Sequence, residues 1–593
     1  MTNYEFGKYA KYAGMRFKNV TKQALYVTMR DGVNIALDVW LPKELTPGEK
    51  IPAIISQTRY WRAREYLPGL SWVDNFFIGG ILFFIKHGYA VILVDSRGTG
   101  ASFGVNRHPW DADEIADQRE IVDWIVAQAW SNGKVGGYGT SYAGTTAELL
   151  TISQHPAVRA VIPRFNEFDV YADVAFPGGV YLEAFAVKWS ESNWNLDHNR
   201  MPKDWGFKGR LLRGVKPVDA DKDRRLLAQA VRDHATNNRM DSFSSELTCR
   251  DDRAQGISVE DFSVHNFRDR IEQSGVPIYG WGGWFDAGTA AAVIHRFMTF
   301  RNPQLAVVGP WNHGANQHAS PYTLGPADTR AQGMEYLKFF DQHLKGADNA
   351  VMSERVLNYF TIGEEKWKAT PVWPPAGSTV QRWYFAADHA LARVAPKSET
   401  GADTYTVDFD ATTGLTNRWH TQKGGGPVLY PDRARQDQRL LVYTSAPLTG
   451  DIEITGFPIV TLFVTSTYAD GAFFVYLEDV DENGKVFYLI EGQFRALHRK
   501  ISDERPPYTQ FVPYHSFKRQ DALLLKPGEM AEITFGLFPI SALVRKGHSI
   551  RIAIAGADKD TFARIPESGT PVLTFARDQI HASFIDLPVI EHA

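Results

Sequence analysis

The feature that most constrains the fold is an alternation of short apolar runs with helix-like segments between residues 51 and 309. The runs "IPAIISQ", "YAVILVD", "KVGGYG", "RAVIPRF", "VPIYGWGG" and "LAVVGPW" are nearly continuously apolar, as strands buried on both faces are. Helix-like segments such as "DEIADQREIVDWIVAQAW" and "TTAELLTISQ" separate several of them. This alternation predicts a doubly wound, largely parallel α/β sheet. Upstream, "QALYVTMRDGVNIALDVWLP" predicts two strands joined by a tight turn at Asp31-Gly32.

The interruption and the end of this alternation predict the domain organisation. Residues 166–264 are polar, helix-prone and tryptophan-bearing, and we interpret them as a helical cap inserted into the core. Beyond residue 351, runs such as "RLLVYTSAPL" and "AFFVYLEDV" are separated by turn residues, which is typical of an antiparallel β-sandwich. A chain of 593 residues is expected to divide into several domains. We therefore predict an α/β core over 1–165 and 265–350, the cap over 166–264 and the sandwich over 351–593.

Composition and charge exclude several classes of function. A net charge of −4 gives no reason to expect nucleic acid or a membrane as a partner. The single cysteine, Cys249, excludes an intramolecular disulfide and a metal site built from cysteines. No signal-peptide pattern is present at the N-terminus. The most apolar run, "FFIGGILFFI" at 76–85, is too short to span a membrane. It predicts a buried helix or a contact surface, including one between copies of the chain, and we expect a soluble, cytoplasmic protein.

The stretch "KVGGYGTSYAGTTAELL" (134–150) places a serine among small residues between a strand-like and a helix-like run. Gly139 lies two residues before Ser141, whereas Ala143 lies two residues after it and Gly144 comes one later. A nucleophile elbow holds its serine on a strained strand-to-helix turn, where the neighbouring residues must be small. Ala143 adds only one methyl group to such a turn. The motif therefore fits an elbow, while an ordinary glycine-rich loop stays open as the alternative on this stretch alone.

Two further residues are candidates for the base and the acid that would activate Ser141. A nucleophilic serine needs a base within hydrogen-bond reach, and the base needs an acid that orients it. Asp286 follows the strand-like "VPIYGWGG", and His313 follows "LAVVGP". The order serine, acid, histidine, each on a loop after a strand, is that of α/β-hydrolases. Three other histidines are alternative bases: His108, His295 and His318.

An acyl-transfer site also needs donors for the oxyanion. The backbone N–H of Tyr142, directly after the nucleophile, is the expected first donor. The second is expected from the loop after "IISQ", where Tyr60 or a backbone amide can serve.

These motifs resemble the bacterial cocaine esterase group of α/β-hydrolases, which also includes α-amino-acid ester hydrolases, cephalosporin acylases and X-prolyl dipeptidyl aminopeptidases. The matching pieces extend over nearly the whole chain: "MRDGVNIALDVWLP", "DSRGTGASFG", "NGKVGGYGTSYAG", "GWGGWFD", "VGPWNHG", "YTSAPLTGDIEITGFPIV" and "FFVYLEDVDENGK". The resemblance implies an α/β-hydrolase core, an inserted helical cap and a C-terminal all-β jelly-roll sandwich. It also implies Ser141 as nucleophile, His313 as base, Asp286 as the orienting acid, and an oxyanion hole made by the Tyr60 hydroxyl and the Tyr142 amide.

The chain departs from this family in two places. The α-amino-acid ester hydrolases carry acids shortly after the triad aspartate, where they hold a substrate ammonium group. Here Ala287, Gly288 and Thr289 follow Asp286, so this loop offers no such acid. Many relatives have Pro-Tyr-Asp at the oxyanion tyrosine, whereas this chain has arginine and tryptophan on either side of Tyr60.

Aromatic residues are candidates for the substrate pocket, with ordinary packing as the alternative for each. The candidates are Trp61 of the core and Tyr171, Phe176, Tyr181, Trp189 and Trp194 of the cap.

Two other motifs resemble binding sites for a dinucleotide and for calcium, and neither fits its pattern. The glycines of "GTGASFG" have the wrong spacing for a dinucleotide. "DVDENG" at 479–484 begins like a calcium loop, but its twelfth position is Ile490. It predicts a hairpin turn at Asn483-Gly484, and we expect no cofactor and no metal.

Together these features predict a serine hydrolase that cleaves small carboxylic esters through a covalent acyl-enzyme. One alternative is an amide-bond hydrolase of the β-lactam acylase or X-prolyl dipeptidyl peptidase type. The other is a non-catalytic protein whose β-sandwich binds a ligand such as a glycan.

Overall fold

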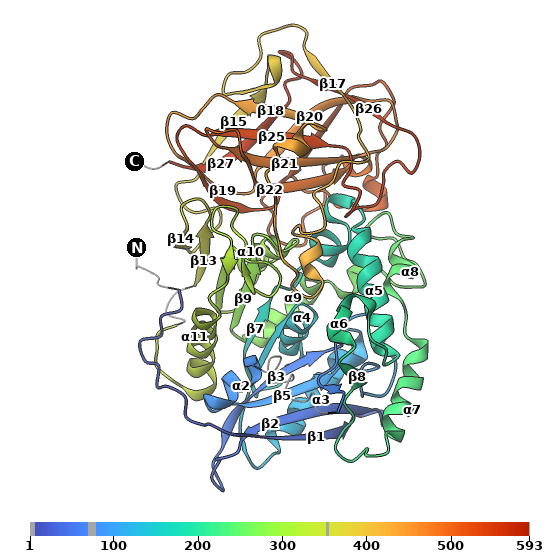
Figure 1. Cartoon of the computed structure of the whole chain (residues 1–593), viewed down its shortest axis with the longest axis vertical. Coiled ribbons are helices and arrows are strands. Elements are labelled where there is room, and N and C mark those ends of the chain that lie inside the picture. Colours follow the sequence, from blue (N-terminus) through green and yellow to red (C-terminus); the bar gives the residue numbers. More distant parts are fainter. Residues whose placement is uncertain (1–5, 69–78, 352–354, 592–593) are drawn as a thin grey trace.

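The computed structural model describes residues 6–68, 79–351 and 355–591 and contains two large sheets in those ranges. Figure 1 shows the first sheet in the lower part of the molecule and the second, from the C-terminal part of the chain, above it. In spatial order, the first sheet contains β1 (Val20–Thr28), β2 (Asn34–Pro42), β5 (Ala90–Asp95), β3 (Ile51–Thr58), β6 (Ser131–Thr140), β7 (Val158–Arg164), β9 (Ile278–Gly283), β10 (Gln304–Gly309), β13 (Val356–Thr361) and β14 (Lys366–Thr370).

The strands from β5 to β13 run parallel to one another, and only the edge pairings are antiparallel. This confirms the predicted parallel sheet. β1 and β2 form the predicted hairpin, in which the Gly32 N–H donates to the Met29 carbonyl at 2.9 Å. Gly32 has φ 82°, a left-handed conformation that glycine adopts without steric cost.

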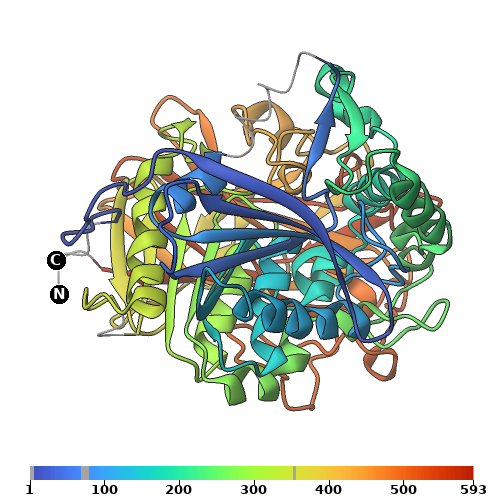
Figure 2. The same cartoon turned by 90° about the horizontal axis from the view of Figure 1, so that it is seen from below.

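Helices cover both faces of this sheet, as Figure 2 shows from below. The buried side chains of α3 (Ala112–Val126), α4 (Tyr142–Leu149) and α9 (Arg268–Ser274) belong to one core, and those of α2 (Gly79–Lys86) and α11 (Thr329–Phe340) belong to a second. Most buried side chains of α10 (Thr289–Thr299) belong to the core of the C-terminal domain. The apolar run at 76–85 therefore ends in a helix, with Phe84 and Ile85 buried. Its first residues, 76–78, lie outside the described residues. In the described ranges, no helix is both long and apolar enough to cross a membrane.

The segment between β7 and β9 is mainly helical and lies along one side of the core, where Figure 1 labels α5, α6, α7 and α8. The π-helix η3 (Tyr171–Ala175) begins it, and α5 (Glu183–Asp197), α6 (Gly206–Gly209), α7 (Arg225–Asp233) and α8 (Met240–Ser244) follow. A short strand, β8 (Leu212–Val215), pairs with β4 (Arg64–Tyr66) from the core. This pairing fixes the cap beside the loop that follows β3.

The second sheet comes from the C-terminal part of the chain. Its 13 described strands are β15 (Thr379–Phe385), β16 (Ala390–Ala392), β17 (Ala402–Thr406), β18 (Leu441–Ser445), β19 (Ile452–Gly456), β20 (Ile459–Ser466), β21 (Ala472–Val480), β22 (Val486–Arg495), β23 (Ala531–Gly536), β24 (Ile540–Val544), β25 (Ser549–Ala555), β26 (Val572–Ala576) and β27 (Phe584–Ile590). The expected fold class, an α/β-hydrolase core with a C-terminal all-β domain, is confirmed. β21 and β22 form the predicted hairpin, with Gly484 at φ 81°.

The first strands after residue 351 belong to the core sheet rather than to the C-terminal sheet. β13 pairs with β10 in parallel, and β14 pairs with β13. Without them, β10 would present an unpaired strand edge. A loop of the C-terminal domain also reaches the core, because the Thr421 hydroxyl oxygen accepts the backbone N–H of His313 at 3.3 Å. The C-terminal domain thus contacts the loop that carries His313.

Candidate active site

Ser141 lies at the sharp turn between β6 and α4. Its backbone has φ 61° and ψ −129°, a conformation that costs a non-glycine residue about 1–3 kcal/mol. The turn is held because the Ser141 N–H donates to the Arg164 carbonyl at the end of β7, at 2.9 Å, and the Ser141 carbonyl accepts from Gly144 at 2.7 Å. Strain of this kind, stabilised by its surroundings, is typical of a nucleophile elbow.

The small residues around Ser141 are required by close backbone approaches. A Cβ atom on Gly139 would lie 2.0 Å from the Ala143 carbonyl oxygen, and one on Gly144 would lie 2.6 Å from that of Arg164. Both positions therefore need glycine. Ala143 itself is accommodated, so the one-residue offset of the second glycine is compatible with this geometry.

Asp286 and His313 face one another across the ends of neighbouring strands. Asp286 follows β9 and His313 follows β10, two parallel strands that lie side by side. His313 Nδ1 lies 3.0 Å from Asp286 Oδ1 and 2.9 Å from Oδ2. Asp286 is fully buried and also accepts the Thr289 hydroxyl at 3.1 Å. Because Nδ1 is occupied by Asp286, Nε2 is the nitrogen of His313 that is available to another group.

Tyr60 lies beside the elbow with its hydroxyl oxygen already hydrogen-bonded. That oxygen accepts the indole N–H of Trp189 at 2.7 Å, so the Tyr60 proton is directed to another acceptor. Burial raises the pKa of Tyr60 to about 12, despite opposing hydrogen bonds with Trp189 and Ser141. The hydroxyl is therefore protonated at neutral pH. Tyr142 begins α4, where the first backbone N–H groups of a helix have no partner within the helix.

Ser141, His313 and Tyr60 line one cavity, which we call the Ser141 cavity, and Tyr142 lines it too. Its remaining walls are largely apolar and come from all three parts of the chain. The core contributes Phe165, the cap contributes Phe185 and Phe262, and the C-terminal domain contributes Gln422. Aromatic walls of this kind suit an apolar or aromatic group of a small molecule.

A buried acid in the Ser141 cavity, Glu167, was not identified in the sequence. It follows β7 at the same edge of the sheet, and its carboxylate accepts the Thr145 hydroxyl at 2.8 Å. Burial is the main reason that the pKa of Glu167 is raised above its usual range. Its place two residues after the strand-like "RAVIPRF" was a signal, since the carboxyl ends of parallel strands meet at one edge.

The aromatic residues proposed for the pocket divide into two groups. Tyr181 and Trp189 line the Ser141 cavity. The other four pack elsewhere: Trp61 donates its indole N–H to the Leu196 carbonyl, Tyr171 stacks on Phe176, and Trp194 packs on His198.

The three alternative histidines have other partners. His108 stacks on Phe262, His295 stacks on Phe457, and His318 pairs with Glu365 at 3.3 Å. Of these four histidines, His313 alone lines the Ser141 cavity and pairs with a buried aspartate in the described part of the chain.

Comparison with known proteins agrees with this architecture. Two family models match the chain: the X-Pro dipeptidyl-peptidase (S15 family) over residues 31–315, and the X-Pro dipeptidyl-peptidase C-terminal non-catalytic domain over 349–585. A Mycobacterium bovis protein named as a serine esterase is 45% identical, covering 98% of this chain and 97% of that protein. The cocaine esterase of a Rhodococcus species is 25% identical, covering 95% of this chain and 98% of that one.

Among solved structures, an aminopeptidase from a marine sediment Thaumarchaeota archaeon matches with a TM-score of 0.74 at 20% identity. The match covers 99% of this chain and 100% of that one, and it supports the fold.

Proposed function

We propose that this hydrolase cleaves carboxylic esters through a covalent acyl-enzyme on Ser141. The chain belongs to the cocaine esterase-like family of α/β-hydrolases. The observation that carries the proposal is the buried Asp286–His313 pair at the cavity that contains the strained Ser141. Base, orienting acid and nucleophile come from the ends of different strands, so their meeting follows from the fold and not from a local motif.

In the first step, His313 Nε2 takes the hydroxyl proton of Ser141 as the Ser141 oxygen attacks the acyl carbon. Asp286 holds the Nδ1–H tautomer of His313 and stabilises the imidazolium that forms. The tetrahedral intermediate then collapses. The bond to the leaving alcohol breaks, and His313 gives its proton to that alcohol. In the second half of the reaction, His313 takes a proton from a water molecule as the water oxygen attacks the acyl carbon. The bond to the Ser141 oxygen then breaks, the acid leaves, and His313 returns the proton to Ser141.

The negative oxygen of the tetrahedral intermediate is stabilised by the Tyr60 hydroxyl and the Tyr142 backbone N–H. The bond from Trp189 fixes the Tyr60 oxygen and leaves its proton to donate. The Tyr142 N–H lies at the start of α4, where the helix dipole also favours negative charge. Donors that are already in place cost little reorganisation when the charge develops.

A second candidate function is favoured by Glu167. Aromatic walls together with one carboxylate can hold a substrate ammonium group, which would suit amino-acid esters or peptides with a free amine. This acid follows β7 and does not lie in the loop after Asp286, where α-amino-acid ester hydrolases carry theirs. The relatives with peptidase names make an amide substrate part of this alternative.

The experiment that separates the candidates compares the methyl esters of phenylalanine and of 3-phenylpropionate, which differ only in the α-amine. We expect wild type and Glu167→Gln to cleave the amine-free ester at rates within about threefold of each other. Glutamine keeps the shape of Glu167 and removes its charge. Amine recognition would instead show as a preference for the phenylalanine ester that falls about tenfold or more in the variant. The corresponding anilides, assayed in parallel, decide between ester and amide.

A further inference from the structure

One loop of the C-terminal domain contacts both of the loops that carry the Asp286–His313 pair. This loop, residues 417–426, contains the short helix η11 (His420–Gln422) and lies between β17 and β18 in the sequence. It belongs to the part of the chain that matches a domain described as non-catalytic. The proposed reaction uses no side chain of this loop, yet its contacts place it directly behind the reacting residues.

Arg418 holds the backbone directly after Asp286. The Ala287 N–H donates to the Arg418 carbonyl at 2.8 Å, and Arg418 Nε donates to the Ala287 carbonyl at 3.1 Å. Arg418 Nη2 donates to the same carbonyl. Both polar groups of the Ala287 backbone are therefore bonded to one residue of another domain.

The backbone conformation of Ala287 explains why this support matters. Its φ is 38°, in the left-handed region that residues with a Cβ atom rarely adopt. A conformation of this kind persists only where the surroundings determine it, and such residues cluster at active sites. Relaxation of Ala287 would turn the chain directly after Asp286 and would move the carboxylate relative to His313.

Arg418 is itself fixed in place. Its side chain is fully buried, and its guanidinium lies 4.7 Å from the ring centre of Phe538. Its backbone N–H donates to the Tyr430 hydroxyl at 2.9 Å. An arginine keeps its charge in a protein interior, and a hydrogen bond from a charged donor is stronger than a neutral one. The bonds to Ala287 are therefore strong and come from a side chain with little freedom to move.

The same loop also holds the backbone at His313. The Thr421 hydroxyl accepts the His313 N–H at 3.3 Å and donates to the Gly426 carbonyl at 2.6 Å. The side-chain amide of Asn312 donates to the Gly425 and Gly426 carbonyls at 3.1 and 3.2 Å. A Cβ atom on Gly425 would lie 2.9 Å from the His313 carbonyl oxygen, so the two backbones approach closely.

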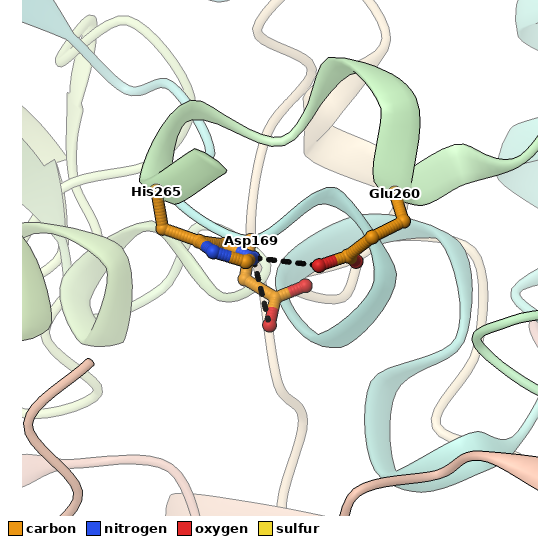
Figure 3. A group of neighbouring side chains, drawn as sticks. All are labelled: Asp169, Glu260 and His265. Carbon is orange, nitrogen blue, oxygen red and sulfur yellow. Dashed lines mark ion pairs between the residues drawn. The ribbon is translucent and has the colours of Figure 1, made fainter. Parts of the chain in front are cut away.

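A second buried arginine, Arg250, anchors the start of the cap. Figure 3 shows Asp169, Glu260 and His265, whose ligand atoms lie close enough together to hold a metal ion. Arg250, however, pairs with Asp169 at 2.8 Å and with Glu260 at 2.9 Å, so the group is an ion-pair network. The Asp169 carbonyl accepts the N–H of Asp173 in η3 at 2.8 Å, which ties η3 to this network.

The turn η3 reaches the loop after Asp286 from the cap side. The Asp173 carbonyl accepts the Gly288 N–H at 3.2 Å, and a Cβ atom on Gly288 would lie 2.7 Å from the Asp173 Cα. The residues after Asp286 are therefore enclosed between the cap on one side and Arg418 on the other.

We propose that Arg418 is a positioning residue of the active site, which acts through the Ala287 backbone to hold Asp286 against His313. Thr421 supports His313 from the same loop. This assignment rests on the proposed hydrolytic role of the pair, and it makes the C-terminal domain part of the catalytic unit. Because Arg418 bonds Ala287 and no reacting atom, its loss should lower kcat and leave KM nearly unchanged.

The first test is ester hydrolysis and thermal melting of Arg418→Met, which keeps the length of the side chain but removes its donors. We expect kcat to fall about 10²-fold, the cost of a displacement on the order of 1 Å, while KM stays within about threefold of wild type. The matched control is Arg433→Met. Arg433 is also buried in the C-terminal domain but pairs with Glu478 of that domain. Its loss should lower the melting temperature and leave kcat within about threefold of wild type.

Thr421→Val tests the support of His313. Valine keeps the shape of threonine without the hydroxyl, and kcat should fall about fivefold, the value of one neutral hydrogen bond. The conservative Thr421→Ser, which keeps the hydroxyl, should restore kcat to within about twofold of wild type. An unchanged kcat in Thr421→Val would overturn the part assigned to Thr421.

A double-mutant cycle separates positioning from general stability. An Asp286→Asn enzyme has no carboxylate for Arg418 to position, so adding Arg418→Met should lower its residual kcat by no more than about threefold. A loss of about 10²-fold in both backgrounds, or a wild-type kcat in folded Arg418→Met, overturns the proposal. If Arg418→Met does not fold, Arg418→Lys replaces it. Lysine lacks the planar fork of donors, so kcat should fall at least about tenfold, again only where Asp286 is present.

Crystal structures of wild type and of the folded Arg418 variant give a readout that needs no activity. In the variant we expect Ala287 to leave the left-handed region and His313 Nδ1 to lose its contact with at least one Asp286 oxygen. An unchanged pair would overturn the positioning role. If wild type hydrolysed no ester but the pair were displaced in the variant, the result would count against the esterase proposal alone.

Discussion

Asp286→Asn is expected to lower kcat for ester hydrolysis about 10⁴-fold while the protein stays folded. The carboxylate contacts His313 Nδ1 through both oxygens, at 3.0 and 2.9 Å, and is fully buried. An asparagine of the same shape presents an N–H where the imidazole needs an acceptor. It therefore favours the tautomer of His313 that has its proton on Nε2, which cannot accept the Ser141 proton. Steady-state kinetics of the purified variant measure the loss.

The control for Asp286→Asn is Thr289→Val. This variant removes the 3.1 Å hydrogen bond to Asp286 Oδ2 but keeps the carboxylate. It should cost no more than about a hundredfold in kcat, the value of one hydrogen bond to a charged group. Equal melting temperatures would show that both variants are folded. An Asp286→Asn enzyme that retains more than about a tenth of wild-type kcat would contradict the assigned role.

Tyr60→Phe is expected to lower kcat about 10²–10³-fold, the usual effect of removing one oxyanion donor. The ring of phenylalanine keeps the edge-to-face packing on Tyr142, whose ring centre lies 6.0 Å away. The loss should therefore fall mainly on kcat, because the bond to the oxyanion forms in the transition state and not with the bound ester. Separate determination of kcat and KM tests this directly.

Trp189→Phe is the comparison for Tyr60→Phe. It removes the N–H that holds the Tyr60 oxygen but leaves the hydroxyl in place, so its effect should be about tenfold or less. If Tyr60→Phe kept kcat within about threefold of wild type, a backbone amide would have to supply the second donor.

The parts of the fold that follow local rules could be predicted from the sequence. Apolar runs separated by helices gave the parallel sheet, and the rule that loops after parallel strands share one edge placed Asp286 and His313 together. The elbow could be predicted because the close backbone contacts at Gly139 and Gly144 require glycine, and the sequence shows glycine at both positions. The roles of these residues in catalysis stay predictions.

The parts that depend on long-range packing could not be predicted. On α5, Phe185 and Trp189 are four residues apart and share the face that lines the Ser141 cavity, whereas Trp194 lies on another face and packs on His198. No periodicity in this polar helix indicated which face would be covered. Gln422 reaches the cavity from the C-terminal domain, and β13 and β14 complete the core sheet from beyond the expected boundary. Both depend on how separate domains dock, which a single sequence does not encode in any local pattern.

The central claim, that Ser141 becomes acylated, is tested most directly by stopped-flow release of nitrophenol from a short-chain nitrophenyl ester. The account predicts that wild type turns the ester over and that Ser141→Ala, folded to the same melting temperature, loses both any burst and about 10⁶-fold in kcat. A burst near one equivalent per chain would show that deacylation is the slower step. Where deacylation is fast and no burst is seen, the rate of Ser141→Ala decides. Wild-type turnover in that variant would contradict the account.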